Sequence, residues 1–253
     1  MSSPGTELRF LDGLVEAMGL QPALLDTVGT TIAVGADRSG SGLASCYQVG
    51  RHTVLWCDGA VAEELEGLVG ERSSLTDDDW RTWARETGRE VLGQAVMKVL
   101  PGPMVLAASP SGATRCSFDW TSDEHVALAE RLVAVSDADD LDDAELDLAE
   151  LDELAFGLLD QSGEIGAFTS MRSWENAERF GDIGVLTRAD LRGSGWGSAA
   201  VTGLIEDVMP AGWDALYRCD PANSGSDLLS GGLGFVTVTS LTAVRVGSSG
   251  SVD

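Results

Sequence analysis

Three glycines stand close together in the segment Arg192-Gly193-Ser194-Gly195-Trp196-Gly197, and this spacing suits a loop that binds an anion. Glycine adopts backbone conformations that are closed to other residues, so successive N–H groups of such a loop can point toward one site. The arginine at the start of the segment adds a positive charge. We therefore interpret this segment, the glycine loop, as a binding site for a phosphate or pyrophosphate group.

A strand and a helix are predicted on the two sides of the glycine loop. A strand is predicted over 182–187, because the run 183–187 is short, apolar and partly β-branched, as expected of a buried strand. After the loop, Val201, Leu204 and Ile205 follow the spacing of one helix face, and Pro210 ends the pattern. The first turn of such a helix presents unpaired N–H groups and a positive dipole end to the loop, which favours the same anion.

The same glycines also fit the G-x-G-x-x-A turn of a dinucleotide-binding fold, with Asp214 and Asp220 near the position of its ribose-binding acid. Two features disfavour that interpretation. About fifty residues follow the loop, too few for the remaining strand and helix units of that fold. The polar segment 189–192 also separates the predicted strand from the first glycine, where a dinucleotide fold would turn at once.

A second motif follows the glycine loop by about thirty residues. It consists of Asn223, at the predicted start of a helix, then Ser226, Leu229 and the final Leu233-Gly234-Phe235. The two motifs, in this order, resemble the acetyl-coenzyme A signatures of the GNAT family (Gcn5-related N-acetyltransferases), whose first signature reads R-x-x-G-x-G. The resemblance covers about residues 114 to 247.

The resemblance implies an α/β fold of the α+β type, the GNAT acyl-CoA N-acyltransferase fold, in which helices flank a mixed sheet. We expect this acetyltransferase domain over residues 114–253, behind an N-terminal α/β accessory domain over residues 1–113. The predicted order in the second domain is βααβββαβαββ, and its last two strands are expected at 235–239 and 241–246. This order is the one that the GNAT fold would have.

Residues 1–113 carry no second glycine loop, so a packing, substrate-shaping or dimerising role is expected for them. A degenerate copy of the same fold is the alternative. The predicted elements are a helix over 7–18, a strand over 30–34, a hairpin over 43–57 and helices over 61–69 and 77–99. Thr76 is the expected N-cap of the last helix, with three acids in its first turn.

The resemblance implies acetyl-coenzyme A (acetyl-CoA) as co-substrate and assigns residues to it. The backbone of Val185, Leu186 and Thr187 would hold the pantetheine arm and polarise the thioester carbonyl where two strands separate. Asn223 would contact the cofactor near its thiol end. The pyrophosphate would be bound by the loop and the start of the next helix, that is by Arg192, Gly193, Ser194, Gly195, Trp196, Gly197 and Ser198.

An amine that attacks a thioester must first be neutral, and the sulfur must leave as a thiolate. By the resemblance, Asp182 stands where the family often has an acid that accepts the ammonium proton. An exposed strand-end role for Asp182 is the alternative, and Glu175 and Glu178 are other candidates. Ser230 falls at the position of the family's frequent tyrosine acid. A serine hydroxyl is a poor acid, so no general acid is assigned. Because a thiol has a pKa of about 8.5, the sulfur can leave as a thiolate and take a proton from water.

The chain carries 41 acidic and 16 basic residues, a net charge of −25. Phosphate binding over a wide surface needs basic residues, so this charge excludes nucleic acid as the expected partner. Ten of the acids lie between Asp137 and Glu153, interleaved with leucines, which predicts a short amphipathic helix. Its acidic face either is simply solvated or attracts a cationic amine acceptor.

The four cysteines are dispersed without a C-x-x-C pair, and the sequence has 2 histidines, so no metal site is predicted and the thiols are expected to be free. The apolar runs are too short for a membrane span, and the N-terminus lacks the pattern of a signal peptide. We therefore expect a cytoplasmic protein without a membrane partner.

These features predict an N-acetyltransferase that transfers the acetyl group of acetyl-CoA to a primary amine of a small molecule, a peptide or a protein. The alternative is a CoA-binding or protein-interaction module on the same fold whose catalytic groups have lapsed. Ser230 favours the alternative, whereas the glycine loop and Asn223 favour the enzyme. The sequence is compatible with a homodimer as well as with a monomer.

Overall fold

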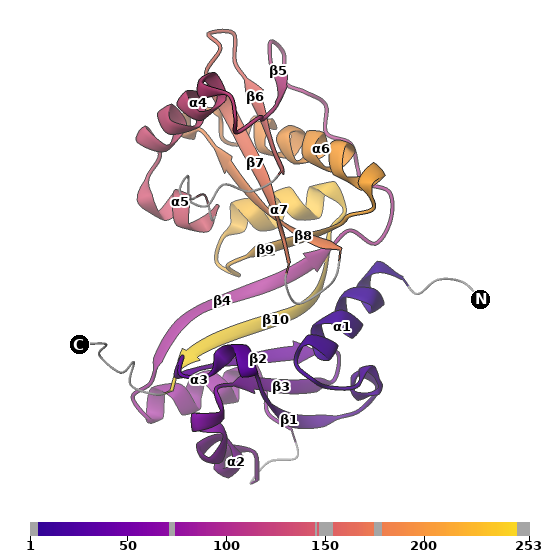
Figure 1. Cartoon of the computed structure of the whole chain (residues 1–253), viewed down its shortest axis with the longest axis vertical. Helices are drawn as coiled ribbons and strands as arrows, with labels where there is room; N and C mark the ends of the chain where they lie inside the picture. The colour runs from indigo at the N-terminus through magenta and orange to yellow at the C-terminus, as the bar shows by residue number, and fades with distance from the viewer. Residues whose placement is uncertain (1–4, 71–73, 145, 147–153, 175–178, 247–253) are drawn as a thin grey trace. The chain divides into compact units, whose positions relative to one another are not determined.

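The structure, a computed structural model, describes residues 5–70, 74–144, 146, 154–174 and 179–246 (Figure 1). The chain forms two compact units. The first unit comprises Met1–Met97 and Thr237–Asp253, and the second unit comprises Lys98–Val236.

The division between the units lies elsewhere than the expected boundary at residues 113 and 114. Residues 98–113 belong to the second unit, where the backbone N–H of Val105 donates a hydrogen bond to the carbonyl of Leu233 at 3.0 Å. The backbone N–H of Ala107 donates to the hydroxyl of Thr202 at 3.2 Å. The last strand of the chain belongs almost entirely to the first unit, because it pairs with a strand of that unit.

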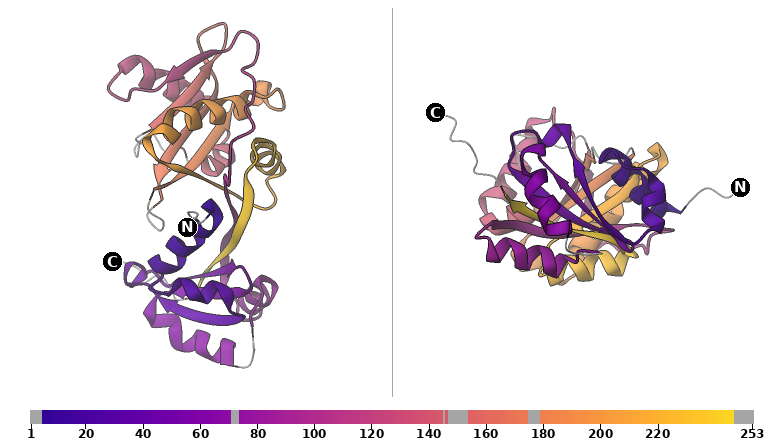
Figure 2. Two further views of the ribbon diagram at one scale, coloured as in Figure 1. Left: turned by 90° about the vertical axis from the view of Figure 1, so that its right-hand side faces the viewer. Right: turned by 90° about the horizontal axis from the view of Figure 1, so that it is seen from below.

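The second unit consists of a sheet with helices on both faces (Figures 1 and 2). Its main elements, in chain order, are β5 (Thr114–Ser117), α4 (Asp123–Ala134), α5 (Ala138–Asp143), β6 (Leu154–Leu159), β7 (Ile165–Ser173), β8 (Phe180–Thr187), α6 (Trp196–Val208), β9 (Asp214–Cys219) and α7 (Ser224–Leu233).

The sheet of the second unit is mixed. Strands β5, β6, β7 and β8 pair antiparallel, each with the next, whereas β9 runs parallel to β8. The prediction of an α/β fold with a mixed sheet flanked by helices is therefore confirmed.

Helices α6 and α4 cover opposite faces of this sheet. A Cβ atom at Gly203 of α6 would lie 2.4 Å from the ring of Phe156, so the helix backbone lies directly against β6 there. On the other face, Leu132 of α4 packs in one cluster with Phe168 of β7. Phe168 pairs with Gly157, the chain neighbour of Phe156, and neighbouring residues of a strand point to opposite faces. The core of the unit lies on both sides of the central strands.

The first unit also combines a sheet with helices. Strand β3 lies between β1, to which it is parallel, and β2, to which it is antiparallel, and β2 pairs antiparallel with β10. Its main elements are α1 (Thr6–Ala17), β1 (Gly29–Val34), β2 (Leu43–Val49), β3 (His52–Cys57), α2 (Ala62–Gly70), α3 (Asp77–Glu86), β4 (Glu90–Val99) and β10 (Val236–Arg245).

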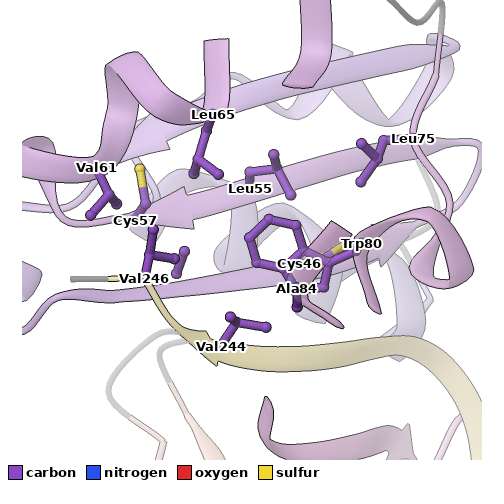
Figure 3. Close-up of a cluster of buried hydrophobic side chains, with 11 residues drawn as sticks. Cys46, Leu55, Cys57, Val61, Leu65, Leu75, Trp80, Ala84, Val244 and Val246 are labelled. Atoms are coloured by element: carbon purple, nitrogen blue, oxygen red, sulfur yellow. The ribbon is translucent and has the colours of Figure 1, made fainter. Parts of the chain in front are cut away.

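A buried cluster joins the helices of the first unit to this sheet (Figure 3). Trp80 of α3 and Leu65 of α2 lie with Leu55 of β3 and Val244 of β10. The indole N–H of Trp80 donates to the carbonyl of Thr242 at 3.2 Å, so the helix is held by a polar contact as well as by packing. The last strand thereby completes a core that the first part of the chain begins.

The prediction of one helix over residues 77–99 is wrong. Thr76 does cap a helix, since its hydroxyl accepts from the N–H of Asp79 at 3.2 Å, but α3 ends at Glu86. Gly88 then takes a φ of +67°, in the left-handed region that commonly ends helices. The chain continues from Glu90 as strand β4, and the glycine was the signal for the change.

The prediction of two strands over 235–239 and 241–246 is also wrong, because β10 runs through both without a turn. Ser240 stays in the ladder opposite Gln48 of β2, so the pairing continues through the position between the two predicted strands. The predicted helix over 7–18, hairpin over 43–57 and strand over 182–187 are confirmed to within two residues. Of the acidic stretch, α5 is helical, whereas residues 145 and 147–153 lie outside the described residues.

Candidate functional site

A cavity of about 510 Å³ opens in the second unit. It lies among the ends of β8 and β9, the glycine loop with the first turn of α6, the first turns of α7, and α5. Its lining residues are Asp140, Asp143, Ile183, Val185, Leu186, Thr187, Arg192, Gly193, Gly195, Trp196, Gly197, Ser198, Tyr217, Arg218, Asn223, Gly225, Ser226, Leu228 and Leu229. Most of the predicted cofactor residues are therefore brought together at one cavity.

The two parallel strands separate at this cavity. Strands β8 and β9 pair at three positions, of which the last joins Asp182 to Leu216. Beyond that position β8 continues to Thr187 and β9 to Cys219, with no further pairs between them. Backbone N–H and C=O groups on the facing edges are then available to an extended ligand that enters between the strands. The resemblance implied such a separation, and the structure contains it.

The glycines of the loop have three separate reasons to be glycine. Gly193 and Gly195 have φ values of +71° and +86°, which residues with a Cβ rarely adopt. Gly195 is also the N-cap of α6. A Cβ atom at Gly197 would lie 2.7 Å from Oγ1 of Thr187, so this glycine lets the first turn of α6 approach β8. The loop thus directs the N-terminus of α6 to the cavity.

Charge at the loop also suits an anion. No acidic residue lies in the first turn of α6, so its unpaired N–H groups and the positive end of the helix dipole face the cavity without a competing side chain of that turn. Ser194 is the one predicted loop residue that does not line the cavity, because its hydroxyl donates to the carbonyl of Leu191.

Two of the predicted cofactor residues, Arg192 and Asn223, contact helix α5 through their side chains. A guanidinium N–H of Arg192 donates to the carboxylate of Asp140, and its Nε donates to the carbonyl of Thr187 at 3.2 Å. The side-chain amide of Asn223 donates to Asp143 at 2.8 Å. Asp140 and Asp143 are three residues apart, on one helix face, and both line the cavity. The carboxylate of Asp140 therefore stands where a phosphate group would meet Arg192, and that of Asp143 stands beside Asn223.

Asn223 also organises helix α7. Its Oδ1 accepts a hydrogen bond from the backbone N–H of Ser226 at 3.0 Å, which makes it the N-cap of that helix. An asparagine at this position satisfies one of the N–H groups that a helix start leaves unpaired. The prediction that a helix begins here is confirmed.

Asp182 lies at the point where β8 and β9 part, in an ion pair. Arg218 of β9 donates to its carboxylate at 2.6 Å, and the same guanidinium stacks over the ring of Trp174 at 4.8 Å. Asp182 lines a small hollow of about 20 Å³ that shares Asp143 and Arg218 with the main cavity, but it does not line the main cavity itself. The alternative acids at positions 175 and 178, Glu175 and Glu178, lie outside the described residues.

Ser230 lies apart from the cavity. The residue is fully buried in α7, where its hydroxyl donates to the carbonyl of Ser226 at 2.8 Å and accepts from the ammonium group of Lys98, also at 2.8 Å. The ammonium group in turn pairs with Asp227. The motif therefore predicted the helix position of this residue, but its side chain takes part in a buried polar contact rather than in the cavity.

Tyr217 lines the cavity, and the sequence analysis did not identify it. It is the first β9 residue after the last pair with β8, its side chain is almost fully buried, and its phenol is hydrogen bonded to the side chain of Ser226. Burial raises the pKa of Tyr217 to about 12. A tyrosine within an apolar strand is typical of core packing, so its sequence context carried no signal of a site.

Among the described residues, no group of three or more His, Cys, Asp or Glu side chains is placed to hold a metal ion. No helix of the described ranges is both long and apolar enough to cross a membrane. All four cysteines are free, and burial raises the pKa of the Cys46 thiol to about 12 and that of the Cys219 thiol in the same direction.

Comparison with solved structures shows which fold this arrangement belongs to. A GCN5-related N-acetyltransferase from Kribbella flavida matches with a TM-score of 0.54 at 15% identity over 96% of each chain. One from Sphaerobacter thermophilus matches with a TM-score of 0.53 at 14% identity, over 94% of this chain and 90% of that one.

A tandem GNAT protein from the clavulanic acid biosynthesis pathway matches with a TM-score of 0.51 at 13% identity over 94% of each chain. No protein-family model and no curated protein matches the sequence. The chain has the fold of the GNAT acetyltransferases.

Proposed function

We propose that this protein binds acetyl-CoA in the cavity of the second unit and transfers the acetyl group to a primary amine. One observation carries the proposal: the cavity joins an anion-binding helix N-terminus to the gap between two parallel strands. A molecule with a pyrophosphate at one end of an extended amide-containing arm matches both features.

The residues present fit acetyl-CoA. The backbone N–H groups of the glycine loop and α6, together with Arg192, would bind the pyrophosphate. The open edge of β8 at Val185, Leu186 and Thr187 would pair with the amide groups of the pantetheine arm, as one strand pairs with another. Acetyl-CoA supplies an activated acyl group in its thioester, so the protein's contribution is to position it and an amine.

The acceptor is proposed to be a cationic amine in solution that loses a proton at the site. Asp140 and Asp143 line the cavity and the whole chain carries a net charge of −25, so the electrostatic field concentrates cations near the cavity. Asp182 remains our proposed proton acceptor, acting from within its ion pair with Arg218 beside the last β8–β9 pair. Only the neutral amine has the lone pair that attacks the carbonyl carbon.

A CoA-binding module without catalysis is the second candidate function. It is favoured by one observation: Ser230, at the position where the family often has a tyrosine acid, is buried outside the cavity. Both functions require the glycine loop, whereas only the enzyme requires a reacting amine.

A turnover assay separates the two. The full chain is incubated with acetyl-CoA and a panel of amines (polyamines, amino acids, lysine peptides and free peptide N-termini), and release of free thiol is followed. We expect release above the amine-free rate with at least one cationic amine, and none with Gly195→Asp, a variant of the loop. Binding of acetyl-CoA without thiol release for any amine class would favour the module instead.

A further inference from the structure

We propose that the phenol of Tyr217 donates a hydrogen bond to the thioester sulfur of acetyl-CoA bound in the cavity, and so stabilises the leaving thiolate. The inference rests on the proposed function. It assigns a leaving-group donor to strand β9, whereas the sequence motif pointed to helix α7 and Ser230.

The position of Tyr217 in the strands supports this role. Tyr217 directly follows Leu216, the last β9 residue that pairs with β8, so it stands at the inner end of the gap. The glycine loop follows β8 and marks the outer end. From Thr187 back to Asp182 the strand spans about 16 Å at about 3.3 Å per residue. An arm anchored by its pyrophosphate at the loop and extended along β8 therefore brings its far end toward Tyr217.

The hydroxyl of Tyr217 is held in a defined place. It is hydrogen bonded to the side chain of Ser226, and the backbone N–H of Ser226 is in turn held by the Oδ1 of Asn223 at 3.0 Å. All three residues line the cavity. If the Ser226 hydroxyl donates to the phenol oxygen, the phenol keeps its own proton for an acceptor in the cavity.

The protonation state of Tyr217 and the chemistry of the thioester reaction both agree with a phenol that donates a hydrogen bond. Burial raises the pKa of Tyr217 to about 12, so the phenol is protonated throughout the neutral range. When the amine nitrogen bonds to the carbonyl carbon, the C–S bond breaks and its electron pair moves to sulfur. The phenol shares its proton with this developing charge, and the thiolate is finally protonated from solvent, while the ammonium proton leaves to the base. No further reactant is needed.

Three other polar side chains near the cavity have other partners or lie elsewhere, so they are not assigned as the donor. The Ser230 hydroxyl is bonded to Lys98 and to the carbonyl of Ser226, and Ser230 does not line the cavity. The guanidinium of Arg218 is paired with Asp182. Oγ1 of Thr187 lies directly against Gly197, at the outer end of the gap.

The test uses free CoA, whose thiol can be titrated on the protein without knowing the acceptor amine. Wild-type protein is compared with Tyr217→Phe, which removes only the hydroxyl, and with Tyr47→Phe, which removes the only other tyrosine hydroxyl of the chain, in the first unit. The pKa of the bound thiol is followed by thiolate absorbance. We expect it to be about one unit higher in Tyr217→Phe than in the other two proteins, a tenfold loss of thiolate stabilisation. The affinity for acetyl-CoA should fall by less than about threefold in Tyr217→Phe, because a thioester sulfur is a weak hydrogen-bond acceptor, and should be unchanged in Tyr47→Phe.

A second variant provides the test in case Tyr217→Phe does not fold. Ser226→Ala keeps the phenol but removes its partner, and we expect a smaller rise of the bound thiol's pKa. Equal thiol pKa values in wild type and Tyr217→Phe, or in wild type and Ser226→Ala if only that variant folds, would overturn the inference and leave the proposed function intact. Failure of the wild type to bind CoA would overturn both, and the binding titration reveals that outcome separately.

Discussion

The two ends of the cavity are built in different ways. At the loop end, the anion site consists of backbone: two glycines with positive φ and the open N-terminus of α6. At the inner end, the candidate chemical groups are side chains held by other side chains. Ser226 is bonded to Tyr217, which lines the cavity, and Arg218 is paired with Asp182, which lines the small hollow beside it. Ligand binding at the loop end would therefore depend on chain conformation, whereas chemistry at the inner end would depend on a few polar contacts that single substitutions can remove.

The largest effect is expected at the loop end. Gly195→Asp forces a side chain into a φ of +86° and places a negative charge at the N-terminus of α6, so acetyl-CoA binding should fall by at least about a hundredfold, or about 3 kcal/mol. Isothermal titration calorimetry measures the affinity of each protein for acetyl-CoA. Gly163→Asp is the matched control, because Gly163 has a φ of +83° with equally open space, in the β6–β7 turn away from the cavity. Equal losses in both variants would refute the loop assignment.

The second effect is expected at the inner end. Asp182→Asn removes the proposed proton acceptor, so kcat/KM for an active amine should fall by about a hundredfold and the acidic limb of the pH profile should change. The affinity for acetyl-CoA should stay the same. Glu206→Gln is the control, since Glu206 also pairs with an arginine, Arg115 at 2.8 Å, but outside the cavity. Full activity of Asp182→Asn would remove this residue from the mechanism.

A smaller effect of opposite sign is expected where α5 meets the loop. Asp140 pairs with Arg192, and a pyrophosphate must compete with that carboxylate. Asp140→Asn should therefore strengthen acetyl-CoA binding by about fivefold, or about 1 kcal/mol, and the gain should shrink at high salt. Asp139→Asn, on the same helix but not lining the cavity, should change the affinity less. Weaker binding in Asp140→Asn would mean that Asp140 positions Arg192 for the ligand instead.

The smallest effect on the ligand is expected at Ser230. Because its hydroxyl bonds to Lys98 inside the second unit, Ser230→Ala should lower the free energy of unfolding by about 1 kcal/mol. The affinity for acetyl-CoA should change less than about twofold, since Ser230 does not line the cavity. Denaturant unfolding and a binding titration measure the two quantities. A tenfold loss of affinity with unchanged stability would show that Ser230 contributes to the binding site.

The loop end could be predicted because its determinants are local. The positive-φ glycines, the strand before them and the helix after them all leave a pattern within about twenty-five residues, and Asn223 leaves an equally local N-cap. The inner end could not be predicted in the same way. Whether Ser230 or Tyr217 reaches the cavity depends on the rotation of α7 and on where β9 leaves β8, and neither has a local pattern.

The two errors in the fold have different causes. Helix α3 and strand β4 were predicted as one helix, but the backbone turns at Gly88, a local signal that the prediction passed over. Strand β10 was predicted as two strands, but its pairing with β2 continues through Ser240. In this second case a distant partner, rather than neighbours along the chain, decides the element.

The central claim, that the loop end binds the pyrophosphate of acetyl-CoA, is tested most directly by calorimetric titration of acetyl-CoA into the full chain. Arg192→Ala and Arg131→Ala are compared with wild type, because both arginines are half exposed and ion paired, but only Arg192 lines this cavity. We predict one-to-one binding in the micromolar range, weakened about tenfold by Arg192→Ala and unchanged by Arg131→Ala. Absence of binding in the wild type, or equal affinity in all three proteins, would contradict the claim.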